Sequence, residues 1–155
     1  MEGKKTLRTK TIEEILQLDP TALIDWLNEE FKMEVPNKLE TIEELKNASK
    51  LLSKTTNTYS YLMNVSSYAK ISVREKKRQS DKLNKEAKAN KDKTIEDELN
   101  QKAAKAKIEY ENMVDRKEAI DNAADIANKQ YNAISRMIAV KREINTELQM
   151  LGSET

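Results

Sequence analysis

Residues 99–138 read LNQKAAKAKIEYENMVDRKEAIDNAADIANKQYNAISRMI, and this stretch decides the fold. Apolar and small residues recur in it at alternating steps of three and four, which places their side chains along one side of an α-helix. Lys117 is the one charged residue in this series. The pattern predicts a long helix with a narrow seam of the coiled-coil type. The seam positions are Leu99, Ala103, Ala106, Tyr110, Met113, Lys117, Ile120, Ala124, Ala127, Tyr131, Ile134 and Ile138.

A second seam of the same kind precedes the first. It begins after Thr41 and Glu44, which have the spacing of a capping box, and Thr94 with Asp97 forms a similar pair before the other seam. Neither Gly nor Pro interrupts either series, so both are expected to be helical throughout. The positions of this second seam are Leu45, Ala48, Leu52, Thr55, Tyr59, Leu62, Ser66, Ala69 and Val73.

The two seams account for each other if the chain folds back at 90–93 and the helices pack antiparallel. We therefore expect an all-α fold, a hairpin over residues 37–151 with long helices near 41–90 and 95–150. A parallel dimer of one continuous helix is the structural alternative. In the hairpin register the facing pairs are Leu52 with Ala133, Tyr59 with Ile126, and Val73 with Met113.

Two short helices are expected within residues 11–36. Thr11 and Glu14 form a further capping box, and Asp19 before Pro20 has the pattern of an N-cap followed by a proline in the first turn. We place these helices at the open end of the hairpin, where their aromatic residues cover apolar side chains. The contacts expected there are those of Trp26 and Phe31 with Ile144, Leu148 and Leu151.

The two ends of the chain depart from the regular pattern. Residues 1–10 are rich in basic residues and poor in apolar ones, so they are predicted to be a flexible basic arm, and 152–155 a flexible tail. Beyond Ile138 the apolar series changes phase, which alters the supercoil locally. The shifted series is Met137, Val140, Ile144, Leu148 and Leu151.

The composition favours an elongated protein over one with a deep globular core. Of the 155 residues, 37% are hydrophobic and 35% are charged, and the mean hydropathy is -0.83. No apolar run approaches the roughly 20 residues of a membrane span, and no signal-peptide core follows Met1. We therefore expect a cytoplasmic protein that does not contact the membrane.

The sequence lacks residues on which many enzyme centres depend. It has no His and no Cys, which excludes Ser-His and Cys-His nucleophile pairs, imidazole bases and His/Cys zinc sites. Glycine occurs only at Gly3 and Gly152, so a phosphate-binding glycine loop is excluded too. We predict a non-enzymatic protein without a cofactor or a metal. The one carboxylate group with the spacing of a magnesium site is interpreted as a solvated helix face; it consists of Glu118, Asp121 and Asp125.

The charges are unevenly distributed, although the net charge is only +1. Residues 74–93 hold nine basic and four acidic residues, an excess of five positive charges. The basic side chains on two neighbouring stripes of this helix, together named the basic strip, are predicted to bind the phosphates of single-stranded DNA; Arg78 and Lys82 form the second stripe. The basic strip comprises Lys70, Arg74, Lys77, Arg78, Lys82, Lys85 and Lys88. Further candidate contacts are Lys76, Lys105 and Lys107.

The alternative interpretation is a solvated hairpin tip, in which these lysines pair with acidic residues of the returning helix. Those residues are Glu96, Asp97, Glu98, Glu109 and Glu111. Three tyrosines near the basic strip offer rings on which bases stack, although Tyr59 is interpreted as a core residue. The tyrosines are Tyr59, Tyr61 and Tyr68.

The N-terminal region is acidic, with ten acidic residues and three lysines in residues 11–47. It is the candidate site for a protein partner, since Trp26 and Phe31 supply apolar anchors and Glu29 and Glu30 flank them. A second copy of the chain is also expected as a partner, because a two-helix hairpin buries little apolar area per residue.

The order of a lysine-rich helix and a long seam is similar to that of the small helical recombination mediators of T-even-like phages. The likeness extends over residues 134–138 (ISRMI) and 141–144 (KREI). Residues 105–110 (KAKIEY) resemble a basic-aromatic motif that this family uses on single-stranded DNA, except that Glu111 and Met113 replace its second aromatic residue and glycine. The resemblance implies an accessory role in DNA recombination or replication. The competing hypothesis is a coiled-coil adaptor or inhibitor that binds only protein.

Overall fold

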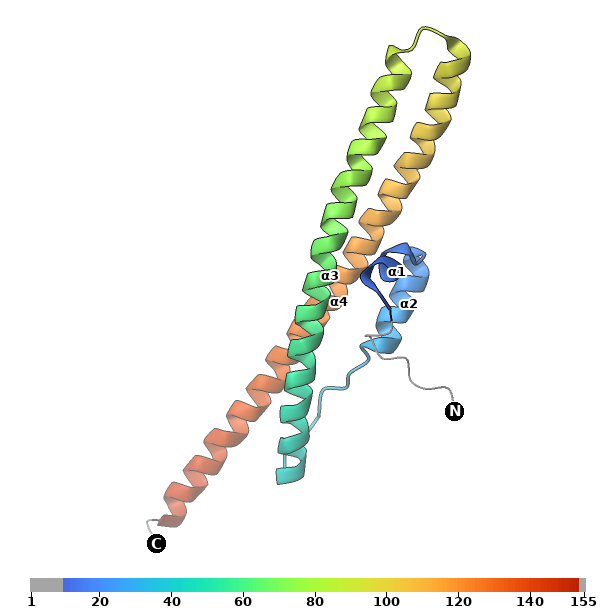
Figure 1. Ribbon diagram of the computed structural model, residues 1–155. Coiled ribbons are helices and arrows are strands. Elements are labelled where there is room, and N and C mark those ends of the chain that lie inside the picture. Colours follow the sequence, from blue (N-terminus) through green and yellow to red (C-terminus); the bar gives the residue numbers. More distant parts are fainter. Residues whose placement is uncertain (1–9, 154–155) are drawn as a thin grey trace, which may run out of the picture.

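A computed structural model describes residues 10–153 and shows a long helical hairpin with two short helices on its side (Figure 1). No strand occurs within these residues, and α3 and α4 pack against each other, which confirms the predicted all-α hairpin. The basic arm predicted for residues 1–10 lies outside the described residues except for Lys10, and so do residues 154–155. The helices are α1 (Ile12–Gln17), α2 (Pro20–Glu30), α3 (Ile42–Ala89) and α4 (Lys93–Ser153).

The helices begin where side chains satisfy free backbone N–H groups. The Thr11 hydroxyl accepts from the Glu14 N–H at 3.2 Å, and the Glu14 carboxylate accepts from the Thr11 N–H at 3.3 Å. Thr41 and Glu44 form the same reciprocal pair before α3. Both predicted capping boxes are therefore present, and each satisfies two donors that a helix leaves unpaired in its first turn.

The start of α4 differs from the prediction. Asp92, rather than Thr94, caps this helix, because its carboxylate accepts from the Thr94 N–H at 3.0 Å. The Asn90 side chain accepts in the same way from the Asp92 N–H at 3.1 Å. These two side chains hydrogen-bond to the backbone two residues ahead and so turn the chain without a glycine. At the other end, α4 continues through Ser153, where a flexible tail was expected from residue 152.

The predicted seam holds the two long helices together. Every buried side chain of α4 belongs to it, and these residues are Ala103, Ala106, Met113, Ile120, Ala124, Ala127, Ile134 and Ile138. The Lys76 ammonium lies 3.1 Å from the Glu109 carboxylate across the hairpin, and the Ser66 hydroxyl donates to Asp121. Both contacts join residues that are about equally far from the turn, as the predicted register requires.

Lys117, the charged residue within the seam, is accommodated by a polar bridge. Its ammonium lies 2.5 Å from the carboxylate of Asp121, one turn further along α4, and Asp121 also accepts from Ser66 on α3. Asp121 was interpreted as part of a solvated face, but the structure places it half-buried against α3. A buried polar group costs little when its hydrogen bonds are made, so the seam tolerates this position.

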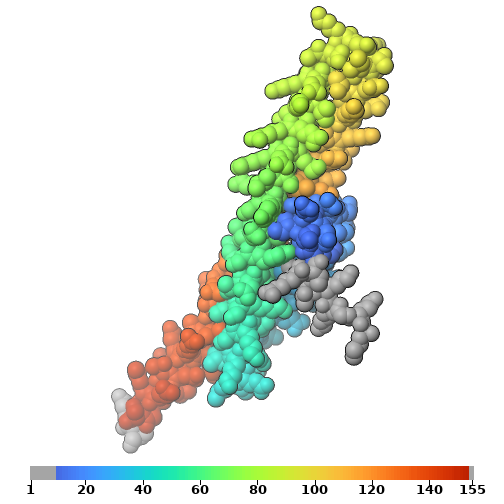
Figure 2. Space-filling model, viewed as in Figure 1, coloured from blue at the N-terminus to red at the C-terminus, as the bar shows by residue number. Residues whose placement is uncertain are grey.

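The short helices do not lie at the open end of the hairpin, so this prediction was wrong. They pack against its middle, as Figures 1 and 2 show, where their buried residues join one core with α3 and α4. The Arg116 guanidinium also donates to the Leu18 carbonyl at 2.5 Å. This core contains Ile15, Leu16, Leu23, Leu27, Leu62, Val65, Ala69, Met113, Ile120 and Ala124.

The physical reason is a second apolar face in the middle of the hairpin. Thr58 and Val65 are buried although neither belongs to the predicted seam, because they face the short helices rather than α4 alone. The open end is covered instead by the segment between α2 and α3, in which Leu39 packs with Ala48 and Ile134. No helix within residues 10–153 is long and apolar enough to cross a membrane.

Replacement of Ile120 by Ala should lower the free energy of unfolding by about 2 to 4 kcal/mol, because the side chain is fully buried and its removal leaves a cavity. Urea denaturation followed by circular dichroism measures the change. The matched control is Ile126→Ala on the same helix, where the side chain is 54% exposed and the loss should stay below about 1 kcal/mol. Equal losses in the two variants would contradict this core.

Candidate functional surfaces

The basic strip lies on the outer side of α3 near the hairpin turn. Its seven cations are all exposed, whereas Ala69, Ser80 and Ala87 on the same helix are buried against α4. Lys70 and Lys88 are five helical turns apart, so the strip is roughly 27 Å long. Figure 2 shows long side chains projecting from this part of α3, away from α4. The strip therefore faces open space along its length.

Few cations of the basic strip are neutralised by a neighbouring acid. Within residues 10–153, Lys82 is the strip member that forms an ion pair, with Glu86 on the same helix at 3.8 Å. Pairing with the returning helix, as the alternative interpretation expects, occurs in the described residues at Lys76, which is half-buried beside Glu109. Six strip cations thus have no acidic partner within 4.0 Å among the described residues.

The remaining basic candidates do not join the basic strip. Lys105 and Lys107 lie on α4 and point in different directions, because two residues correspond to about 200° around a helix. The Lys107 ammonium is also 3.9 Å from the Glu111 carboxylate. The structure brings together the seven strip residues of α3, and it leaves Lys76, Lys105 and Lys107 apart from them.

The three tyrosines have different environments. Tyr59 and Tyr61 are partly buried against the core of the hairpin, and burial raises the pKa of Tyr61. Tyr68 is 50% exposed and stands two residues before Lys70. Tyr68 is therefore the most accessible of the three tyrosines, but its ring points away from Lys70 and borders the pocket beside α1.

The aromatic residues of the acidic region contact each other and the rest of the chain. The Trp26 and Phe31 rings meet edge to face with centroids 6.1 Å apart, and the Lys10 ammonium lies 5.7 Å from the Trp26 ring centroid. Both rings are half-buried, while Glu29 is exposed and Glu30 is half-buried. The role of Trp26 as an anchor for a partner stays a prediction, and its ring packs against Phe31 within the chain.

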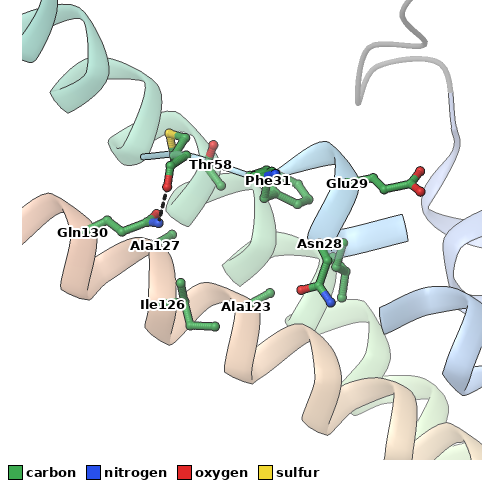
Figure 3. Close-up of a pocket in the computed structure, with 11 residues that line it drawn as sticks. Asn28, Glu29, Phe31, Thr58, Ala123, Ile126, Ala127 and Gln130 are labelled. Atoms are coloured by element: carbon green, nitrogen blue, oxygen red, sulfur yellow. Dashed lines mark hydrogen bonds between the residues drawn. The ribbon is translucent and has the colours of Figure 1, made fainter. Parts of the chain in front are cut away.

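A hollow of about 490 Å³ lies between α2 and the two long helices (Figure 3). Ala123, Ile126 and Ala127 of α4 face Phe31 and Asn28 across it, and Glu29 extends from its rim. On the far side the Gln130 side chain donates to the Met33 carbonyl at 3.1 Å. Phe31 and Glu29 were predicted for a partner site, whereas Ile126 was expected to face Tyr59 across the hairpin. Ile126 is instead 54% exposed and forms a wall of the hollow beside the seam residue Ala127.

Within residues 10–153, no three His, Cys, Asp or Glu side chains lie close enough together to hold a metal ion. Of the three carboxylates considered, Asp121 is paired with Lys117, and Asp125 lies 2.8 Å from the Lys129 ammonium. The hydrogen bond with Asp125 raises the pKa of Lys129. Two of these carboxylates thus form ion pairs with lysines one turn away on α4, and Glu118 is exposed.

No family model, curated protein or solved structure matches the chain. The resemblance to phage recombination mediators therefore stays a prediction, which rests on the residues given for it.

The stability of the hairpin should depend on the charge of Asp121. Partial burial by itself raises the pKa of Asp121, but hydrogen bonds from Lys117 and Ser66 outweigh this effect and hold the pKa below its ordinary value. A lowered carboxyl pKa contributes stability above the unfolded-state value of about 3.9, and this contribution is lost as the pH falls through the folded-state pKa. Asp121→Asn should thus be less stable than the original chain near pH 6.

The difference between the two proteins should shrink as the pH is lowered from about 6 to about 3, since protonation removes the advantage of the carboxylate. Urea denaturation at a series of pH values measures it. A difference that does not vary with pH would show that the ionised form of Asp121 contributes nothing to stability.

Proposed function

We propose that this protein is a non-enzymatic accessory factor of phage-type DNA recombination or replication, and that it binds single-stranded nucleic acid through the basic strip. The observation that carries the proposal is the row of exposed cations on α3, of which all but Lys82 form no ion pair within residues 10–153. The proposed place of action is the cytoplasm of a host cell, where such DNA is processed.

The charge arrangement supports phosphate binding. A cation that is already paired must lose its partner before it contacts a phosphate, whereas the unpaired cations of the basic strip only exchange water and counterions. Asp81 lies among them and weakens the local field, but residues 74–93 retain five excess positive charges. Release of condensed counterions from the nucleic acid then supplies most of the binding free energy.

The shape of the surface favours single-stranded over double-stranded nucleic acid. The exposed cations follow one another along the straight helix α3, and a flexible single strand can follow them over a few nucleotides. Tyr68 is half-exposed, but its ring lies about 160° from Lys70 around the helix and borders the pocket beside α1, so the proposed binding rests on charge. Binding of this kind reads the phosphates and not the bases, so we expect little sequence preference.

Reversal of three strip charges should abolish binding to labelled single-stranded DNA. The variant Lys77→Glu, Lys85→Glu, Lys88→Glu is expected to lose more than about tenfold in affinity, because three phosphate contacts become repulsive. Fluorescence anisotropy at about 50 and 200 mM salt measures the affinity, which should fall steeply with salt for the original chain.

The matched control reverses three other exposed lysines of the same helix, Lys46, Lys50 and Lys54. This control changes the net charge by the same amount outside the strip, so it should retain most of the affinity. Absence of binding by the original chain at about 50 mM salt, or equal loss in both variants, would rule out the basic strip as the site.

A second candidate function, a protein-binding adaptor, is supported by the hollow beside α2. Its walls are mainly apolar, with Phe31 and Ile126 on opposite sides, and it is large enough for an apolar side chain of a partner. The exposed carboxylate of Glu29 at the rim favours a partner with a basic residue next to that apolar anchor.

The adaptor hypothesis predicts that Ile126→Glu releases a protein captured by the original chain, because a charge would enter the apolar hollow. Affinity purification with quantitative mass spectrometry gives the readout. The matched control is Ile108→Glu on α4, where the isoleucine is 57% exposed and lies outside the hollow. A captured protein that remains bound to Ile126→Glu would exclude the hollow as its docking site.

A further inference from the structure

The C-terminal end of α4 extends beyond the start of α3 and carries an uncovered apolar surface. α3 begins at Ile42, and residues 142–153 of α4 are exposed throughout. Figure 1 shows this end of α4 running past the rest of the molecule. Leu148 and Leu151 are 63% and 64% exposed. They lie close to each other on the helix, so they form an apolar patch and are not single scattered residues.

The apolar residues of this region continue a line that begins at Met137, which is half-buried beside Ile134 and Ile138, and at Val140, which is exposed. The spacing of this line reads the same in both directions. Its residues follow one another at steps of three, four, four and three, and all lie within about 40° of Ile144 around the helix. We call this line the C-terminal stripe; it comprises Met137, Val140, Ile144, Leu148 and Leu151.

We propose that the C-terminal stripe docks a second copy of this chain, antiparallel and with the two-fold axis at Ile144. A two-fold contact uses the same surface on both copies, so each residue must find a suitable partner at the mirrored position of the series. The symmetric spacing meets this condition. Ile144 meets Ile144 of the second copy, Val140 meets Leu148, and Met137 meets Leu151.

A hollow beside the stripe fits this arrangement. It has a volume of about 400 Å³ and is lined by Leu39, Met137, Val140 and Ile144 together with polar residues at its rim. In the antiparallel pair it lies opposite Leu148 and Leu151 of the second copy, which are the most exposed residues of the stripe. Each copy therefore offers both the protruding side chains and the hollow that receives them.

The alternatives fit the surface less well. A membrane-surface helix is typically rich in Lys and Arg on its polar face, but between Met137 and Leu151 the charged positions hold Lys141 and Arg142 together with Glu143 and Glu147, so this face has no excess of positive charge. A flat lipid surface would also leave the hollow beside Leu39 unfilled. The two-fold pairing fills the hollow and covers the stripe along its whole length.

The buried area sets the expected strength of the contact. The exposed parts of the stripe amount to roughly 800 to 900 Å² for two copies, just below the roughly 1,000 Å² of a specific protein interface. We therefore expect a reversible dimer that forms at tens of micromolar rather than a permanent one.

Sedimentation equilibrium of the full chain between about 2 and 200 μM tests the proposal. The original chain should change from monomer to dimer over this range, and Ile144→Glu should remain monomeric, because it places two carboxylates side by side at the axis. Ile108→Glu is the matched control and should dimerise normally. A monomer at 200 μM, or equal behaviour of the two variants, would overturn the proposal.

Disulfide formation tests the orientation, since the chain contains no cysteine of its own. A mixture of Val140→Cys and Leu148→Cys chains should form mainly the mixed disulfide, because these positions face each other in the antiparallel pair. Predominant 140–140 and 148–148 disulfides would show a parallel contact and overturn the proposed arrangement. Circular dichroism of each variant confirms that helicity is unchanged.

Discussion

Close approach of two long helices depends here on the small residues between them. Buried alanines occur along the contact of α3 and α4, among them Ala48, Ala69, Ala103 and Ala124. An alanine permits a short distance between helix axes but buries little apolar area, and hydrophobic stabilisation grows with the area buried. The hairpin seam is therefore well matched in shape and modest in stabilising free energy.

This limit explains the position of the short helices. Leu23, Leu62 and Ile120 are among the largest fully buried side chains, and they meet where α1 and α2 pack on the hairpin. The middle of the molecule thus buries the most apolar area, because α1 and α2 pack there against both α3 and α4. The two ends of the hairpin lie outside this core and keep their surfaces available.

The two exposed ends differ in chemistry. The turn end presents the basic strip, and the opposite end presents the C-terminal stripe. Pairing two copies through their stripes would direct the two basic strips to opposite ends of an elongated dimer, with their centres roughly 110 Å apart. An arrangement of this kind suits a factor that holds two separate stretches of nucleic acid, provided that the proposed function is right.

The sequence by itself determined the all-α class, the two long helices and the capping boxes before α1 and α3, because these features depend on residues a few positions apart. It also indicated the antiparallel register, because two apolar seams on either side of a short break can cover each other when the chain folds back. It also located the basic strip, since charge on an exposed helix face follows from spacing alone. The same local patterns were less reliable at the ends of helices, where Asp92 replaced Thr94 as the cap of α4.

Only the tertiary structure decided where α1 and α2 lie, and with them the hollow of Figure 3 and the exposure of Ile144 and Leu148. The residues between α2 and α3 permit several placements of the short helices, and amphipathic patterns do not say which apolar face they cover. The choice depends on Thr58 and Val65, which are unremarkable in sequence and form a second apolar face only once α3 and α4 have paired.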